Sequence, residues 1–494
     1  MADQDKKKST IPLWLALLPL ALLIGMLALS VSLFHDNSSY GPNQIALLLA
    51  AGIAAVIGLR LGMRWHELEK AMVDGITLAL RACLILLAVG SLIGSWMLAG
   101  TAPAVIYYGL GILDPAWFYP AALIICSLVA LSIGSSWTTA GTIGLALIGI
   151  AQIMDLSLAV TAGAVISGAY FGDKMSPLSD TTNLSPAMVG TDLFVHIRHM
   201  MWTTTPSIVI ALITFTLMGL NSEAVQAPPG EISAARDLLR ANYYVGIAAL
   251  LPLALLLLLA WRKVPAFPSI AIGALAGCVV ALIWQPELVR DFADPDGALP
   301  GWLAAVKALF MALADGFHIE TGDAALDELL SRGGMSSMLN TIWLILSAMS
   351  FGGVMEHTGL LQRIVDQLMK GVRGTGSLIT TTVLTCIGMN IIAADQYIAI
   401  VLPGRMYRLE YKRRGLAPQN LSRTLEDAGT MTSALVPWNT CGAFMAATLG
   451  VPTLTYLPYA FVNLLNPVIA IVYGITRFTI VPLAPTEESS PARA

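Results

Sequence analysis

The sequence predicts an all-α polytopic membrane protein with inverted repeats, two re-entrant hairpins, two broken helices and about ten full transmembrane spans. Three observations support this fold class. Of the 494 residues, 56% are hydrophobic and 12% are charged, whereas about 25% are charged in an ordinary soluble domain. Uncharged runs about as long as a bilayer-spanning helix recur along the chain. Lys and Arg residues gather on one side of the spans that these runs define.

Residues 1–71 are predicted to form N-terminal transmembrane helices, with spans at 11–34 and 43–62. The first run is long for a signal peptide and is followed by no evident small-residue cleavage site. Lysines at positions 6–8 place the N-terminus in the cytoplasm, because short cytoplasmic segments are rich in Lys and Arg. The same rule makes residues 477–494 a cytoplasmic tail.

Two later units are predicted to be a first inverted repeat at 72–220 and a second at 338–476. Each unit holds a full span, a re-entrant hairpin, a broken span and a final span. In chain order these are 72–99, 117–152, 158–197 and 201–220, then 338–357, 377–403, 425–451 and 456–476.

The two units match each other weakly in sequence. Met97 and Met355 occupy similar segments 258 positions apart, and Asn183 and Thr440 do so 257 positions apart. The first unit begins inside and the second begins outside, so the repeats have inverted topology. Inverted repeats with interrupted helices are typical of secondary transporters, whose sites lie near the middle of the bilayer.

Residues 221–337 are predicted to be linking helices and an external loop, with spans at 243–261 and 266–285. Trp302 to Phe317 is predicted to be an interfacial helix, because an eleventh crossing would move the later basic loops outside. Of the 27 Lys and Arg residues, this topology places 20 on the cytoplasmic side, 5 outside and 2 within spans.

Four polar segments interrupt the repeats, at 134–142, 172–186, 390–397 and 426–440. Polar backbone at membrane depth is tolerated where it is buried in protein or lines a cavity, and ionisable residues there indicate an ion or substrate site. The candidate ion-binding or substrate-binding residues are Ser135, Ser136, Thr138, Asp173, Asp180, Thr181, Thr182, Asn183, Asp395, Asn439 and Thr440.

Oxygen ligands in these segments favour a small hard cation such as sodium over a transition metal. The sodium ligands that we predict are Asp173, Asp180, Asn183, Asp395 and Asn439. A buried carboxylate can bind either sodium or a proton, and competition for one carboxylate would couple their movements. The alternative is that Asp180 and Asp395 are helix N-caps. No cofactor is expected, since sodium would be a transported substrate.

Three further charged residues are interpreted as structural. Lys174 either balances the local charge or extends its ammonium group away from the site. Glu426 and Asp427 follow a basic loop and are interpreted as capping residues at the membrane interface.

Other classes of protein fit less well. The sequence contains no phosphate-binding GxxxxGK[ST] loop of an ATP-driven pump, and no TVGYG-like channel filter or Arg-rich voltage sensor. Asp173 and Asp180 could form the catalytic pair of an intramembrane enzyme, but an intramembrane protease has no need of paired unwound segments in inverted repeats. The basic run from Arg405 to Arg414 is short and explained by topology, so nucleic-acid binding is not expected.

The segment GAYFGDKMSPLSDTTNLSPAMVGTDLFVHIRHM strongly resembles the signature region of the NhaC family of sodium/proton antiporters. AADQYIAIVLPGRMY and EDAGTMTSALVPWNTCGAF resemble a second characteristic region of that family. The resemblance implies the fold of the ion transporter superfamily: a scaffold part with dimer contacts, and a transport part that moves like an elevator. It also implies a homodimer in the cell membrane that transports sodium and protons.

The resemblance leaves open which substrate the protein transports. Relatives resembling the family include sodium-linked carriers of malate and lactate or of amino acids. Hydroxyl groups such as those of Ser135, Ser136 and Thr138 would suit a carboxylate substrate at a helix N-terminus. Sodium/proton exchange is favoured, because the breaks offer no Arg for a bidentate carboxylate contact.

Overall fold

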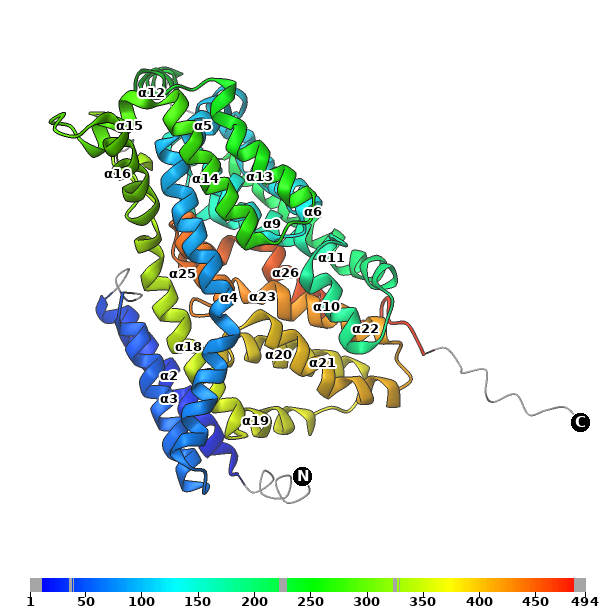
Figure 1. The fold of residues 1–494 in the computed structure, drawn as a ribbon. Coiled ribbons are helices and arrows are strands. Elements are labelled where there is room, and N and C mark those ends of the chain that lie inside the picture. Colours follow the sequence, from blue (N-terminus) through cyan, green and yellow to red (C-terminus); the bar gives the residue numbers. More distant parts are fainter. Residues whose placement is uncertain are drawn as a thin grey trace, which may run out of the picture.

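The computed structural model describes residues 11–34, 38, 40–221, 229–322, 327 and 329–483, and its regular elements are helices joined by short turns (Figure 1). Within these residues, nine helices are long and apolar enough to cross a membrane, or eleven if two bent pairs each count as one span. The predicted all-α membrane class is therefore confirmed. The N-terminal lysines and residues 484–494 of the predicted tail lie outside the described residues.

A first group of helices runs along one side of the molecule (Figure 1). Helix α3 packs against α2 and α18, and α4 packs against α18 and α14. Helix α4 has 34 residues and starts at Trp65, before the predicted start at 72. At 1.5 Å per residue it is about 51 Å long, so it extends well beyond the ~30 Å hydrocarbon core. The bounds are α2 (Leu13–Phe34), α3 (Pro42–Arg60), α4 (Trp65–Leu98), α14 (Ala266–Trp284) and α18 (Leu339–His357).

The linking region contains a sharp bend that the sequence did not predict. Residues 232–242 and 247–261 form two helical arms at 90° to each other, so the predicted span at 243–261 is only the second arm of a bent pair. The expected interfacial segment forms α16, which packs against α4. Its position relative to the membrane stays a prediction. The bounds are α12 (Pro229–Asn242), η5 (Ile247–Leu250), α13 (Leu251–Trp261), α15 (Pro286–Ala293), α16 (Gly301–Ala314) and η6 (Met335–Met338).

In each predicted repeat, a long helix is followed by a short helix, a helical hairpin, an interrupted helix and a final helix. After α4, the first continues with α5 (Thr101–Ile112), η2 (Pro115–Trp117), α6 (Phe118–Ile133), α7 (Ser136–Thr139), η3 (Ala140–Gly144), α8 (Leu145–Ile153), α9 (Leu158–Met175), α10 (Asp180–Val189) and α11 (Leu193–Leu220). After α18, the second continues with α19 (Leu360–Met369), α20 (Thr375–Ile392), α21 (Gln396–Arg413), α22 (Pro418–Leu425), η7 (Glu426–Thr430), α23 (Met431–Ser433), α24 (Thr440–Leu449), α25 (Thr453–Tyr456), η8 (Leu457–Tyr459) and α26 (Phe461–Thr476).

Residues that begin or end helices recur in both units at nearly constant spacing. Gly100 and Gly359, both in the left-handed region, precede the short helices α5 and α19 and are 259 positions apart. The N-caps of the second hairpin arms are 260 apart, and so are those of the second halves of the broken helices. Helices α6 and α9 lie in the upper half of Figure 1, and α20 and α21 in the lower half. The opposite orientation of the repeats relative to a membrane stays a prediction.

Several other predicted boundaries also differ from the structure, three of them in the broken and final spans. The first broken span does not run to 197, because α10 ends at Val189 and a new helix, α11, begins at Leu193. Asp192 starts α11 by accepting hydrogen bonds from two backbone N–H groups at its N-terminus. The second broken span begins at Pro418 instead of 425. The final helix begins at Phe461 instead of 456, because α24 and residues 453–459 form a pair bent by 89°.

Close packing of α9 against α6 fixes the position of the first helix break. A Cβ atom at Gly168 would overlap the Leu123 carbonyl oxygen, and one at Gly172 would overlap that of Ser127. Glycines four residues apart on one helix face allow two helices to approach closely within a membrane. Asp173, which follows Gly172 directly, is thereby held beside the end of α6.

Candidate functional site

Asp173 joins the first broken helix to the tip of the first hairpin. It lies in the last turn of α9 and is 7% exposed. Its Oδ2 atom accepts hydrogen bonds from the backbone N–H of Ser136 (3.0 Å) and from the Ser136 hydroxyl group (2.7 Å). Ser136 is the first residue of α7, where the positive end of the helix dipole stabilises an anion. The structure therefore brings together two predicted site residues from different segments.

The first break spans residues 176–179, and side chains of α10 form hydrogen bonds with backbone carbonyl groups in and beside it. Pro177 removes a backbone donor there. The Thr182 hydroxyl group contacts the carbonyl oxygens of Asp173 (3.1 Å) and Lys174 (3.0 Å). The side-chain amide of Asn183 donates to the carbonyl oxygens of Pro177 (2.9 Å) and Ser179 (2.7 Å). These contacts give Thr182 and Asn183 structural roles, and sodium binding by them stays a prediction.

Other predicted residues of the first unit cap helices or line the break. Ser135 is the N-cap of α7 and accepts from the backbone N–H (3.2 Å) and hydroxyl group (3.1 Å) of Thr138. The Thr181 hydroxyl group lies 3.1 Å from that of Ser179, the N-cap of α10. Asp180 is not the N-cap, because it is the first residue of α10 and Ser179 caps that helix. The Asp180 side chain is exposed. The break is therefore open on the side of Asp180.

The tip of the second hairpin is attached to the second broken helix in a comparable way. Asp395 is the N-cap of α21, is 6% exposed and accepts a hydrogen bond from Ile398 N (3.0 Å). The Asn439 side chain donates to the Asn390 backbone and side-chain oxygens, each at 3.1 Å. Thr440 N donates to the Ala394 carbonyl oxygen (2.9 Å). Asn439 and Thr440 therefore hold the hairpin tip at the break between α23 and α24.

One side chain at the second hairpin tip interacts electrostatically with acidic groups of both units. The Tyr397 hydroxyl group, at the start of α21, interacts electrostatically with Asp173, Asp180 and Asp395. All three predicted acidic ligands are thus within electrostatic reach of one side chain.

Lys174 and Asp427 form an ion pair in the interior of the protein. Both side chains are 0% exposed, and the Lys174 Nζ atom contacts Asp427 Oδ1 directly. Lys174 Nζ also donates to Asn466 Oδ1 (2.6 Å), and the Thr203 hydroxyl group donates to Asp427 Oδ1 (2.8 Å). Arg423 Nε lies 3.8 Å from the other carboxylate oxygen of Asp427.

Glu426 is also fully buried. Its Oε1 atom accepts a hydrogen bond from the Ser185 hydroxyl group of α10 (2.7 Å), so it links the two broken helices. The interpretation of Glu426 and Asp427 as interfacial caps is wrong, and Lys174 does not extend away from the site. The signal for this pairing was Lys174 itself, because a buried ammonium group needs a buried anion.

Carboxyl groups outnumber cations among the buried ionisable side chains of the two repeats. Within the described residues of these helices, the buried Lys and Arg side chains are Lys174 and Arg423, and the buried histidines are His196 and His199. The buried carboxyl groups are Asp173, Asp395, Glu426 and Asp427. With neutral histidines and all carboxyl groups ionised, the interior would carry two uncompensated negative charges. Such a site attracts monovalent cations or protons, because uncompensated charge is costly at low dielectric.

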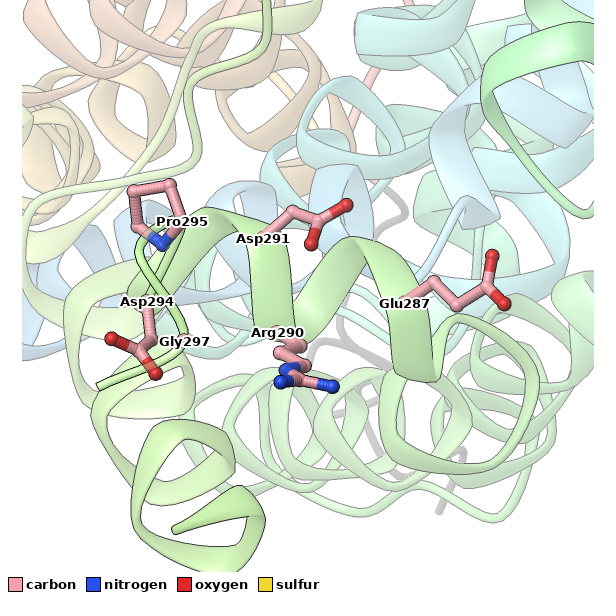
Figure 2. Close-up of a pocket in the computed structure, with 6 residues that line it drawn as sticks. All are labelled: Glu287, Arg290, Asp291, Asp294, Pro295 and Gly297. Carbon is pink, nitrogen blue, oxygen red and sulfur yellow. The ribbon is translucent and has the colours of Figure 1, made fainter. Parts of the chain in front are cut away.

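Two hollows lie away from these carboxyl groups. One, of about 360 Å³, lies between the α4–η6 and α8–α24 segments and is lined by residues including Ile93, Leu145, Arg332 and Thr448. The other, of about 250 Å³, is a polar surface pocket around α15 (Figure 2). It is lined by Glu287, Arg290, Asp291, Asp294, Pro295 and Gly297. None of these residues belongs to a helix break or hairpin tip, so we assign the α15 pocket no part in the site.

Interrupted helices that place buried carboxylates at two hairpin tips, in an all-helical membrane protein, define a secondary transporter. The chain belongs to the Na+/H+ antiporter family, which it matches over residues 168–478. The matched region contains Asp173, Asp395, Glu426 and Asp427.

Three relatives cover nearly the whole chain. The Na(+)/H(+) antiporter NhaC of Alkalihalophilus pseudofirmus is 39% identical, over 95% of this chain and 96% of its own. The malate-2H(+)/Na(+)-lactate antiporter of Bacillus subtilis is 36% identical, over 91% and 92%. The arginine/ornithine antiporter ArcD of Halobacterium salinarum is 36% identical, over 96% and 93%. The sequence identities of these three relatives differ by at most 3 percentage points, so identity does not distinguish between their substrates. The substrate of this chain must be argued from the site.

Proposed function

We propose that this protein exchanges sodium ions for protons across the cell membrane. The observation that carries the proposal is the contact between Asp173 and the first hairpin tip, with Asp180 and Asp395 in electrostatic reach of the same tyrosine. Carboxylate and hydroxyl oxygens suit a hard monovalent cation. Membership of the Na+/H+ antiporter family supports the same exchange.

The exchange requires that the carboxylates reach each side of the membrane in turn. We propose an elevator-like movement of the hairpins and broken helices against the group that contains α3, α4 and α18. The 360 Å³ hollow between the α4–η6 and α8–α24 segments lies on the boundary along which such a movement would occur. Both termini are proposed to be cytoplasmic.

A second candidate function is sodium-linked exchange of an organic anion or amino acid. It is favoured by the relatives named for malate and lactate exchange and for arginine and ornithine exchange. Against it, Lys174 already contacts Asp427 and Asn466 and offers no free charge to a carboxylate substrate.

Purified protein in sealed vesicles that contain a pH-sensitive dye separates the two functions. A sodium gradient alone is expected to change the internal pH, because sodium and protons are the exchanged ions. No response to sodium alone, followed by a response when malate, lactate or arginine is added, would contradict sodium/proton exchange and favour the second function.

Single cysteines test both the topology and the movement, in a background without the five native cysteines, all of which are buried. Arg413→Cys, at an exposed side chain, is expected to react with an impermeant thiol reagent from the cytoplasm alone. Asn183→Cys, at the exposed side of the first break, is expected to react from either side as the site moves. Labelling of Arg413→Cys from outside would overturn the topology, and one-sided labelling of Asn183→Cys would overturn the movement.

A further inference from the structure

Glu426 is a buried carboxyl group without a cation of its own. The Ser185 hydroxyl group donates to its Oε1 atom (2.7 Å), while its Oε2 atom has no hydrogen-bond partner within the described part of the chain. The Thr430 hydroxyl group, four residues further along η7, also interacts with the Glu426 carboxyl group. The side chains that contact this buried carboxyl group are thus neutral hydroxyl groups, which leaves its charge to be explained.

The charges around Glu426 explain why it has no counter-ion. Lys174, whose ammonium group interacts electrostatically with Glu426, is already neutralised by Asp427, the next residue of η7. Arg423, on the preceding turn, also faces Asp427.

Within the described residues, the other elements packed against η7 add no further Lys or Arg side chain that interacts with Glu426. From α9, Asp173 interacts electrostatically with Glu426, as Lys174 does. From α20, the Cys386 thiol interacts with it. Helix α21 contributes Tyr407 and Tyr411, which interact with Cys386. Tyr473 of α26 interacts with Arg423, and α10 contributes the Ser185 hydroxyl group. Glu426 therefore lies among neutral hydroxyl and thiol groups, the Asp173 carboxyl group and a Lys174 ammonium group that is already paired with Asp427.

An isolated carboxylate at low dielectric is strongly unfavourable. Glu426 must therefore hold a proton, or have a cation close by, whenever it lies in this environment. Its position on a π-helical turn agrees with this role, because π turns inside α-helices occur frequently at functional sites. Asp173 connects this proton to sodium binding. A negative charge on Asp173 disfavours ionisation of Glu426, and a sodium ion bound at Asp173 neutralises that charge.

We propose that Glu426 carries the transported proton, while sodium binds at Asp173 beside the hairpin tip. Sodium binding releases the proton from the Glu426 carboxyl group to water, and sodium release allows the carboxylate to take up a proton again. The two ions are thus coupled through two interacting carboxyl groups rather than by competition for one. This inference rests on the proposed sodium/proton exchange.

The experiment compares two fluxes in vesicles that contain the full-length protein. Sodium-driven proton flux requires a titrating proton carrier, whereas exchange of labelled sodium for unlabelled sodium does not. Glu426→Gln is expected to lower the first flux by about tenfold or more, since the ionisable group is lost. Sodium–sodium exchange is expected to persist and to lose its dependence on pH. Glu69→Gln, at an exposed residue of α4, is the matched control.

Infrared difference spectra give a readout that does not depend on transport. Addition of sodium to the wild-type protein is expected to remove a band from a protonated carboxyl group, and Glu426→Gln is expected to lack this change. Glu426→Asp, which keeps the carboxyl group, is expected to retain proton flux with a shifted pH profile. This variant tests the role of Glu426 as proton carrier if Glu426→Gln fails to fold.

Three results would overturn the assignment to Glu426: wild-type proton flux in Glu426→Gln, an unchanged infrared band in that variant, or loss of sodium–sodium exchange in folded Glu426→Gln. The last result would make Glu426 part of the sodium site instead. If the wild-type protein itself shows no sodium-driven proton flux, the proposed function fails, which is a different outcome from failure of this inference.

Discussion

Lys174→Met is expected to lower the free energy of unfolding by about 3 to 5 kcal/mol, the usual cost of removing one partner of a buried ion pair. Both members of the Lys174–Asp427 pair are 0% exposed. The variant leaves the Asp427 carboxylate with the Thr203 hydroxyl group and with Arg423 at 3.8 Å. The measurement is unfolding of the purified protein in mixed micelles, followed by a spectroscopic signal of helix content.

The triple variant Lys174→Met/Arg423→Met/Asp427→Leu separates loss of the pair from burial of an unpaired charge. It is expected to be more stable than Lys174→Met alone, because it removes the Asp427 carboxylate together with both of its cationic partners. Lys70→Met, at an exposed residue of α4, is the control for loss of a positive charge. Equal stability of Lys174→Met and Lys70→Met would show that the Lys174–Asp427 contact contributes little to folding.

Asp173→Asn is expected to weaken sodium binding by about 10- to 100-fold, because a hydrogen bond or contact to a charged group contributes about 1.5 to 3 kcal/mol. Asparagine has nearly the same size and keeps one oxygen that can accept from Ser136, so the contact with the hairpin tip is retained while the charge is lost. The measurements are calorimetric sodium affinity in detergent and sodium-driven proton flux in vesicles.

Asp155→Asn provides the matched control for this change. Asp155 is exposed and has a positive φ of 52°, a conformation that asparagine also tolerates. It is expected to leave sodium affinity and flux unchanged. Wild-type sodium affinity in folded Asp173→Asn would remove Asp173 from the sodium site and would favour Asp180 or Asp395 as the ligand.

Local signals in the sequence predicted where the helices of the transport part are interrupted. Pro177 lies within the first break and Pro437 within the second. Both side chains that cap the resumed helices, Ser179 and Asn439, are short polar residues of the type preferred at N-caps. Proline, glycine and capping residues act on their own turn of the chain, so they are readable without knowledge of the fold.

Two boundaries were not predicted, although the first of them carries a local capping signal. The start of α11 depends on Asp192, which acts as an N-cap and separates α10 from α11. From the sequence alone, an Asp residue at this position was equally compatible with a span that continues through it. The 90° bend between α12 and α13 was likewise not predicted, because no proline lies within the bend.

By itself, the sequence determined the membrane class, the interrupted helices and the predicted carboxylates at the breaks, because hydropathy, helix breaking and capping are properties of short segments. The tertiary structure alone decided that Lys174 pairs with Asp427, 253 residues away, and that Glu426 faces Ser185, 241 residues away. The hydropathy of the segment around Glu426 and Asp427 fits an interfacial turn as well as a buried one. Their burial depends on α9, α10, α11 and α26 enclosing them, and the energetic cost of unpaired buried charge then determines which side chains must meet.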